Sequence, residues 1–179
     1  MNTKKAVALI LTAIVLLMIP LGCGPAEPAN KDTHALSLAS PGTIEEDVGY
    51  FDLSEAFRDS LWAFAGKTSG VALQAFDGTN TLYSPVSLYY GLAMLEAGAA
   101  GTTKTDLRAF LETDADARMG EQLRKLYALM TLDGDDTVER IANALWIRED
   151  LVSDQGGVKQ SWLDQLSEDF YASAFAVDF

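Results

Sequence analysis

The sequence predicts a mixed α+β fold, in which several helices surround one buried helix and are accompanied by two strands. The first observation is the segment 85–97, which carries a single charged residue and is apolar almost all round. A helix of this kind is buried rather than laid on a surface. The second is a pair of strand-like apolar runs at 137–148 and 171–179. The third is the apolar content of 49% over 179 residues, which suits one globular domain and excludes full disorder.

The composition excludes several classes of function. The chain holds one cysteine, so an internal disulfide and a cysteine-rich zinc site are excluded. One histidine leaves little room for histidine-based metal or triad chemistry. With 26 acidic and 13 basic residues the net charge is −13, which argues against a nucleic-acid partner. The sequence shows neither a Gly-rich phosphate loop nor zinc-ligand spacing, and it predicts no cofactor and no metal.

Residues 1–22 are predicted to be a signal peptide outside the fold. Two lysines precede an apolar run over 6–21, which is short for a membrane span and has the length of a signal-peptide core. Cys23 follows a small residue, and this step resembles the lipobox of bacterial lipoproteins, although Pro20 stands where that motif usually has leucine. The resemblance implies export, lipid on Cys23 and attachment to a membrane. An ordinary signal peptide that leads to secretion, or an uncleaved anchor, is the alternative.

Residues 23–49 are predicted to hold this lipid site and a flexible tether, and residues 50–179 to form the domain. The tether contains several prolines and an acidic cluster at 45–47, but no apolar periodicity. His34 lies in this stretch. A ligand or a general base needs rigid surroundings, so His34 is predicted to be a solvated residue.

The first two helices of the domain are predicted from their caps and their spacing. A helix over 52–65 begins with a capping-box pattern and is expected to end at Gly66. The buried helix over 85–97 follows a short extended run at 81–83. Ser84 is its predicted N-cap and Pro85 takes the first helical position, where proline is favoured.

Three further helices are expected at 103–111, 116–130 and around 162–170. The polar face of the second mixes acids and bases, which is typical of a solvated surface rather than a polyanion site. The acidic run 133–136 lacks the glycine and glutamate spacing of an EF-hand, so it is interpreted as a turn.

The two strands carry different patterns. Residues 141–147 are apolar apart from Asn143, which predicts a strand covered on both faces, with a buried amide that must be hydrogen-bonded. Residues 171–179 alternate, with larger side chains on one side and small residues on the other.

The chain is predicted not to be an enzyme. Ser84 is the only serine in a distinctive setting, and it is explained as a helix cap. A serine hydrolase would require a lysine partner that the sequence does not reveal.

Two motifs of the domain resemble the serpin family, and the likeness extends over 51–179. The first motif covers residues 80–88, 91–95 and 98–102 and reads Asn-Thr-Leu-Tyr-Ser-Pro-Val-Ser-Leu, Gly-Leu-Ala-Met-Leu and Gly-Ala-Ala-Gly-Thr. The second is Ile-Ala-Asn-Ala-Leu-Trp-Ile over 141–147. It is followed, at the family's spacing, by a helix that ends near Tyr171 and by a strand that ends at Phe179.

The resemblance implies an inhibitor of serine proteases, and sometimes of cysteine proteases, that acts as a suicide substrate. The target protease cleaves an exposed reactive loop, which inserts as a new strand into the large sheet. By the same resemblance, residues 137–148 and 172–179 would be neighbouring strands of that sheet. The region where the sheet opens would hold Ser84, Pro85, Ser87 and Asn143. Gly91 matches a position where a small residue permits close packing.

The family's reactive loop, its central strands and its C-terminal hairpins would follow Phe179. The chain is therefore expected to be an incomplete domain, a fragment of a longer inhibitor with an unpaired strand edge. A membrane-tethered binding or scaffold module without inhibitory function, or a truncated relic, is the alternative.

Overall fold

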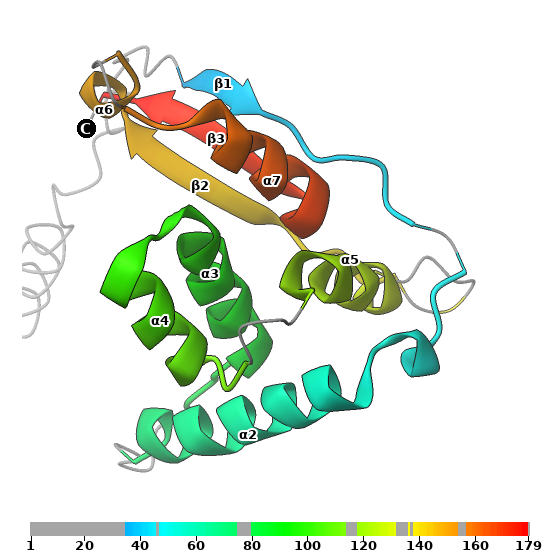
Figure 1. Ribbon diagram of the computed structural model, residues 1–179. Coiled ribbons are helices and arrows are strands. Elements are labelled where there is room, and N and C mark those ends of the chain that lie inside the picture. The colour runs from blue at the N-terminus through cyan, green and yellow to red at the C-terminus, as the bar shows by residue number, and fades with distance from the viewer. Residues whose placement is uncertain are drawn as a thin grey trace, which may run out of the picture. The chain divides into compact units, whose positions relative to one another are not determined.

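Figure 1 shows the computed structural model of the chain, which describes residues 35–45, 47–74, 80–113, 118–131, 136, 138–153 and 157–178. The predicted signal peptide, Cys23, His34 and most of the turn at 133–136 lie outside these residues. None of the helices in the described part is long and apolar enough to cross a membrane.

One sheet of three strands occupies one side of the described domain. The strands are β1 (Leu36–Ala39), β2 (Asn143–Arg148) and β3 (Ala172–Val177), in the spatial order β1-β3-β2. β2 and β3 are parallel neighbours, with Asn143 opposite Ala172 and Arg148 opposite Val177. Both predicted strands are therefore present and adjacent, although the first begins at Asn143 rather than at residue 137.

β1 corrects the prediction of a structureless tether over 23–49. It pairs with β3 in the antiparallel sense, with Leu36 opposite Ala176. The sequence pattern misses it because four residues are too few to show a period. Their pairing depends on a strand at the other end of the chain.

Helices cover one side of the sheet and extend away from it (Figure 1). They are a 3-10 turn η1 (Tyr50–Asp52) and the helices α2 (Glu55–Ala72), α3 (Pro85–Gly98), α4 (Gly101–Phe110), α5 (Met119–Met130), α6 (Glu149–Ser153) and α7 (Gln160–Phe170). The described residues therefore form the mixed α+β fold that the sequence predicts.

Two details of the helical half differ from prediction. α2 continues through Gly66 to Ala72, because Phe64 and Thr68 are buried on either side of that glycine. Their packing outweighs the cost of about 1 kcal/mol that glycine brings to a helix. The short helix α6 has no counterpart in the prediction, in which the strand that ends at Arg148 is followed by a turn.

α3 lies at the centre of the core, as predicted. Tyr89 is fully buried and meets the rings of Phe57 and Phe64 of α2 edge-on, with ring centroids 6.1 and 5.1 Å away. On the side of α7, the indole nitrogen of Trp162 donates a hydrogen bond of 3.0 Å to the carbonyl of Met94. The covering is not complete, since Leu95 is half exposed.

The sheet is buried on one face only, which corrects the prediction that 141–147 is covered on both. The small residues Ala172, Ala174 and Ala176 of β3 are buried, and α7 packs beside them. On the opposite face Trp146 of β2 is 55% exposed and stacks on Phe175 of β3 at 4.7 Å. This open face is lined by stacked aromatic rings instead of a second layer of helices among the described residues.

α7 ends abruptly at Tyr171. This residue is the C-cap and adopts the left-handed conformation, with φ 46° and ψ 40°. Residues other than glycine seldom adopt this conformation. The buried ring of Tyr171 packs against Tyr127 of α5, with centroids 4.7 Å apart, and that contact holds the turn that starts β3.

Candidate functional site

The first part of the site is the start of α3. Ser84 is the N-cap, as predicted, and its hydroxyl accepts the backbone N–H of Ser87 at 3.3 Å. The two serine hydroxyls also share a hydrogen bond of 2.8 Å. Pro85 occupies the first turn. The Ser-Pro-x-Ser pattern thus forms a capped helix N-terminus. The hydroxyl groups of its two serines are exposed and hydrogen-bonded to each other.

The second part is the N-terminal end of β2. The side-chain amide of Asn143 donates to the carbonyl of Phe170 at 2.8 Å. That carbonyl belongs to the last residue of α7, so the bond satisfies one of the groups that a helix end leaves without a partner. Asn143 is half-buried and hydrogen-bonded, and it fixes the position of β2 relative to α7.

A cavity of about 380 Å³ joins these two parts. Its polar lining includes Ser84 and Ser87 at the start of α3, Asn143 of β2, and Glu139. The remaining lining residues are Val86, Tyr90, Gly91, Met94, Met130, Ile141, Ala142 and Ala144. Three of the four residues predicted for the sheet-opening region therefore share one cavity.

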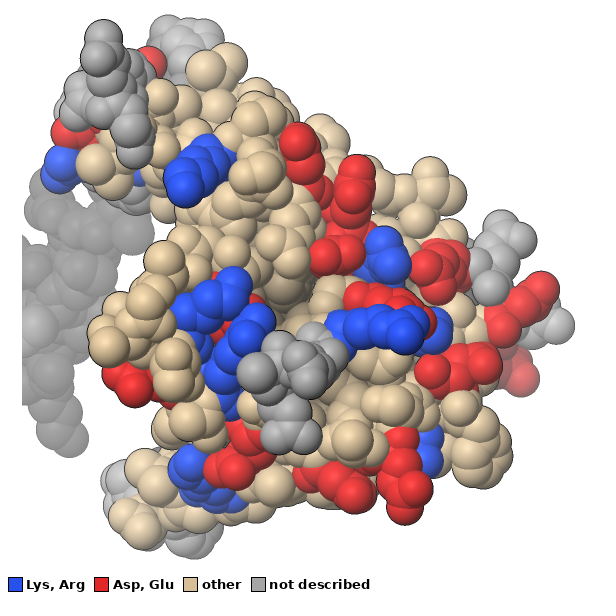
Figure 2. All heavy atoms as spheres, viewed as in Figure 1, with Lys and Arg blue, Asp and Glu red and all other residues tan. Residues whose placement is uncertain are grey.

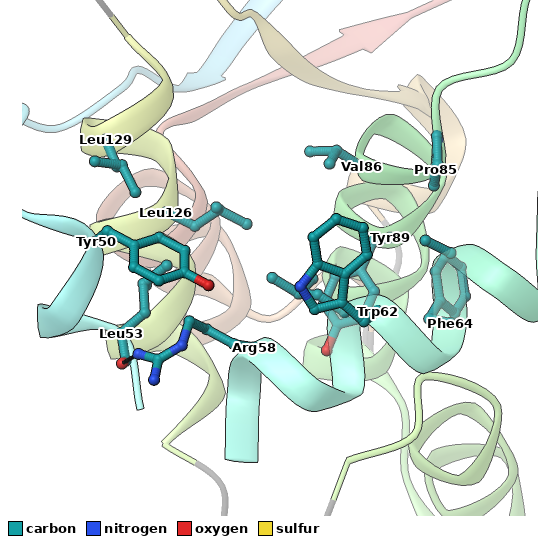
Figure 3. Close-up of a pocket in the computed structure, with 12 residues that line it drawn as sticks. Tyr50, Leu53, Arg58, Trp62, Phe64, Pro85, Val86, Tyr89, Leu126 and Leu129 are labelled. Atoms are coloured by element: carbon teal, nitrogen blue, oxygen red, sulfur yellow. Dashed lines mark hydrogen bonds between the residues drawn. The ribbon is translucent and has the colours of Figure 1, made fainter. Parts of the chain in front are cut away.

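Pro85 lies on another side of the same helix end. It lines a second, apolar pocket of about 270 Å³ among α2, α3 and α5. Figure 3 shows Trp62 of α2, Tyr89 of α3 and Leu126 of α5 around it, with Arg58 at its rim. Val86 lines both hollows, so the first turn of α3 separates a polar cavity from an apolar one.

Gly91 does not have the role that its position predicts. A Cβ atom placed there would meet nothing within 4 Å, although Gly91 lines the polar cavity. Close packing instead requires glycine at Gly98, where a Cβ would approach the ring of Trp162 to 2.6 Å.

Two buried tyrosines near the site bond to distant backbone carbonyls, and these contacts were not predicted from the sequence. Tyr90 donates to the carbonyl of Leu123 at 2.7 Å, and Tyr127 donates to the carbonyl of Ile141 at 2.5 Å. Burial raises the pKa of the Tyr90 hydroxyl, with smaller contributions from Tyr127 and Tyr171. Tyr127 falls on the apolar stripe of its helix, but the sequence offers no signal that its hydroxyl reaches the chain just before β2.

The polar groups that the structure describes at this site are chiefly hydroxyls and an amide. The hydroxyl of Ser84 is bonded to Ser87 rather than to a general base. Among the residues that the structure describes, no three His, Cys, Asp or Glu side chains lie close enough to hold a metal ion. Serine hydroxyls and an amide offer donors and acceptors instead, which suits contacts to a peptide backbone.

The outer edge of β2 borders this cavity. Within the described residues β2 pairs with β3 on one side only, so the backbone groups of its other edge have no strand opposite them. An edge of this kind accepts a further strand.

The surface around the site carries paired charges. Figure 2 shows acidic and basic side chains interspersed on one face. On α5, Lys125 and Arg118 both pair with Glu121, at 2.7 and 3.4 Å, and Arg124 pairs with Asp169 at 3.4 Å. This agrees with a solvated polar face on α5.

Comparisons with known proteins agree on one family. A family model described as serpin (serine protease inhibitor) matches residues 63–179. Human alpha-1-antichymotrypsin is 27% identical over 165 residues, which cover 88% of this chain and 35% of that protein. Human neuroserpin is 28% identical over 103 residues, 56% of this chain and 24% of that protein. The chain thus spans about a third of the length of the first of these relatives.

Proposed function

The chain belongs to the serpin family, and on that premise we propose that it is the N-terminal part of a protease inhibitor that admits a strand into its sheet. The family model matches more than half of the chain. The observation that carries the proposal is the cavity between the start of α3 and the start of β2, which Ser84, Ser87 and Asn143 line. In this proposal the protein is an inhibitor, not an enzyme, and its partner is a serine protease.

The proposed mechanism requires an edge that is regular and accessible. β2 keeps one uninterrupted register with β3 from Asn143 to Arg148. Its backbone groups are therefore spaced as an incoming strand needs them. In this proposal the family's central strands, which would follow Phe179, extend the sheet here without breaking the ladder between β2 and β3.

The cavity provides space for β2 to move relative to α3. The polar contacts around it are the Ser84–Ser87 hydroxyl pair and the Asn143 amide bond to Phe170. Hydroxyl groups both donate and accept, so the serines can exchange their mutual bond for bonds to an inserted backbone. This supports a role for Ser84, Ser87 and Asn143 in sheet opening.

The test uses the product of the complete reading frame that contains these residues. It is incubated with proteases of trypsin, chymotrypsin and elastase specificity and with a papain-type cysteine protease. We expect a complex that survives denaturing gel electrophoresis, together with loss of protease activity. The matched control is a protease whose catalytic serine is replaced by alanine, which should form no such complex.

Cleavage of the protein by every protease, with full protease activity remaining, would reject the proposal. A stop codon directly after the Phe179 codon, with a soluble folded product, would favour the tethered binding module instead. Downstream sequence with a hinge of small residues and an exposed loop would favour the inhibitor.

We also propose that the protein is exported and attached to a membrane through lipid on Cys23. The support is the sequence of residues 1–23 alone. Mass spectrometry of the mature N-terminus tests it, because a lipidated cysteine adds the mass of its acyl chains. A mature N-terminus at another residue, without added mass, would leave secretion as the explanation.

A further inference from the structure

The segment 36–45, which we call the N-terminal strap, is fixed along the side of the domain away from the open edge of β2. It begins with β1 against β3 and then passes α7 toward α5 (Figure 1). Leu38 and Ala39 are half-buried and pack against the core. The rest of the strap is exposed, so its position depends on specific polar contacts.

Four such contacts follow β1 in order. The hydroxyl of Ser167 donates to the carbonyl of Ser40 at 2.5 Å, and the N–H of Gly42 donates to the carbonyl of Ser167 at 3.1 Å. At Glu45 the backbone N–H donates to the hydroxyl of Tyr171 at 3.2 Å, and the carboxylate lies 3.6 Å from Arg124. The strap is therefore held by α7, by the start of β3 and by α5.

β1 changes what the outer side of the sheet presents to a partner. Without it, β3 would expose a regular six-residue edge. With it, the outermost strand has four residues and a register shift between Ser37 and Ala39. Short and irregular edge strands are the means by which proteins prevent pairing at a sheet edge.

The two edges of the sheet are thus unlike. β2 presents six residues in uninterrupted register, and β1 presents a short, shifted strand. We propose that the N-terminal strap closes the β3 edge, so that no further strand adds to the sheet on that side. The biological role of this closure rests on the proposed function. The docking of the strap on β3 can be tested without any protease.

The first test measures hydrogen exchange of backbone amides in the full chain. The double variant Ser167→Ala/Arg124→Met removes two of the four contacts. The control Ser161→Ala/Arg118→Met makes the same changes at exposed positions, one in α7 and one at the N-cap of α5. We expect exchange in 36–45 to rise about tenfold in the first variant, the effect of losing roughly one net hydrogen bond, and to stay constant in the control.

Two results of this test would overturn the proposal. One is rapid, unprotected exchange of 36–45 in the unmodified chain, since the strap would then not be docked. The other is an equal rise in exchange in 143–148, since the contacts would then hold the whole domain rather than the edge.

The second test asks whether the closed edge is a strand-binding surface. Ser37→Pro/Ala39→Pro removes donors from β1 and frees β3, because proline cannot join a ladder. A fluorescent peptide with the sequence of residues 35–45 is titrated against both chains and followed by polarisation. We expect at least about tenfold tighter binding to the proline variant, and weaker binding when Arg124→Met is added.

Equal binding to the proline variant and to the unmodified chain, or binding to neither, would contradict closure of the β3 edge. Neither outcome involves a protease. A failed inhibition assay and a failed strap experiment are therefore distinguishable.

Discussion

Because Gly98 has no side chain, α7 can pack closely on α3 at this point. The Trp162 ring lies over this glycine while its nitrogen bonds to the carbonyl of Met94. The ring therefore cannot move aside without losing a hydrogen bond. Gly98 and Trp162 together fix how α7 packs on α3.

We expect Gly98→Ala to lower the free energy of unfolding by about 1–3 kcal/mol, the usual effect of overpacking. The matched control is Gly91→Ala in the same helix, where the added carbon meets nothing. That change should raise stability by about 0.5–1 kcal/mol, because alanine favours helix. Urea unfolding measures both, and equal effects of the two substitutions would contradict the contact with Trp162.

Asn143 is the residue of the site whose removal should have the clearest effect on the fold. Asn143→Leu deletes the donor to the carbonyl of Phe170. We expect a loss of about 1 kcal/mol in unfolding free energy and faster amide exchange at the start of β2. Ala144→Leu, at an exposed position of the same strand, is the control and should change neither quantity.

The buried hydroxyl of Tyr90 predicts sensitivity to alkali. Burial raises its pKa above the ordinary value of 10.0. Above pH 10 the unfolded chain therefore releases a proton that the folded chain keeps. Stability should hold between pH 7 and 9 and then fall by up to about 1.4 kcal/mol per pH unit for this group. Urea unfolding across pH 7 to 11 should show a shallower fall for Tyr90→Phe than for the unmodified chain, and an equal fall would contradict the prediction.

At the scale of the elements, ion pairs connect α3 to α4. Glu96, the one charged residue of α3, is 5% exposed, and its carboxylate lies 2.6 Å from Arg108 and 3.5 Å from Lys104 of α4. A largely buried carboxylate is costly unless it is paired, so these contacts fix α4 against α3.

We expect Glu96→Gln to destabilise the domain by roughly 1–3 kcal/mol, below the full value for a buried pair because the cations are partly exposed. The exposed pair Lys67–Glu112, at 2.8 Å, provides the control. Lys67→Met should cost less than about 1 kcal/mol. Thermal unfolding of the two variants compares them, and an equal effect would show that burial of Glu96 does not matter.

The elements also show what could be predicted from the sequence. The start of α3 was predicted correctly because Ser84 and Pro85 act within one turn. The pairing of β2 with β3 followed from the family resemblance. By contrast, α2 passes Gly66 and β1 forms because of contacts with distant parts of the chain. In the site, the serine pair was predictable, whereas the contact between Tyr127 and Ile141 depends on tertiary structure.

At the scale of the whole molecule, the described domain exposes several large apolar side chains. Leu82 is 99% exposed, Phe51 88% and Trp62 72%. Trp62 lines the apolar pocket of Figure 3. Exposed apolar side chains of this size favour association between molecules when they meet on neighbouring copies.

We expect the chain of 179 residues, produced alone, to self-associate as its concentration rises, despite its net charge of −13. Trp62→Arg/Leu82→Lys should shift sedimentation velocity profiles toward the monomer. The control Glu55→Arg/Asp59→Lys adds positive charge to α2 without removing apolar surface. A similar shift in the control would mean that charge, rather than the apolar surface, governs association.

The N-terminal strap has a consequence for the order in which the protein forms. β1 is the earliest described element to leave the ribosome, yet Leu36 pairs with Ala176, close to the last described residue. At about 5–20 residues per second, the nascent segment waits on the order of ten seconds for its partner to be synthesised. Docking of β1 is therefore a late, long-range event, and its rate decides how long a newly completed β3 is available to neighbouring nascent chains.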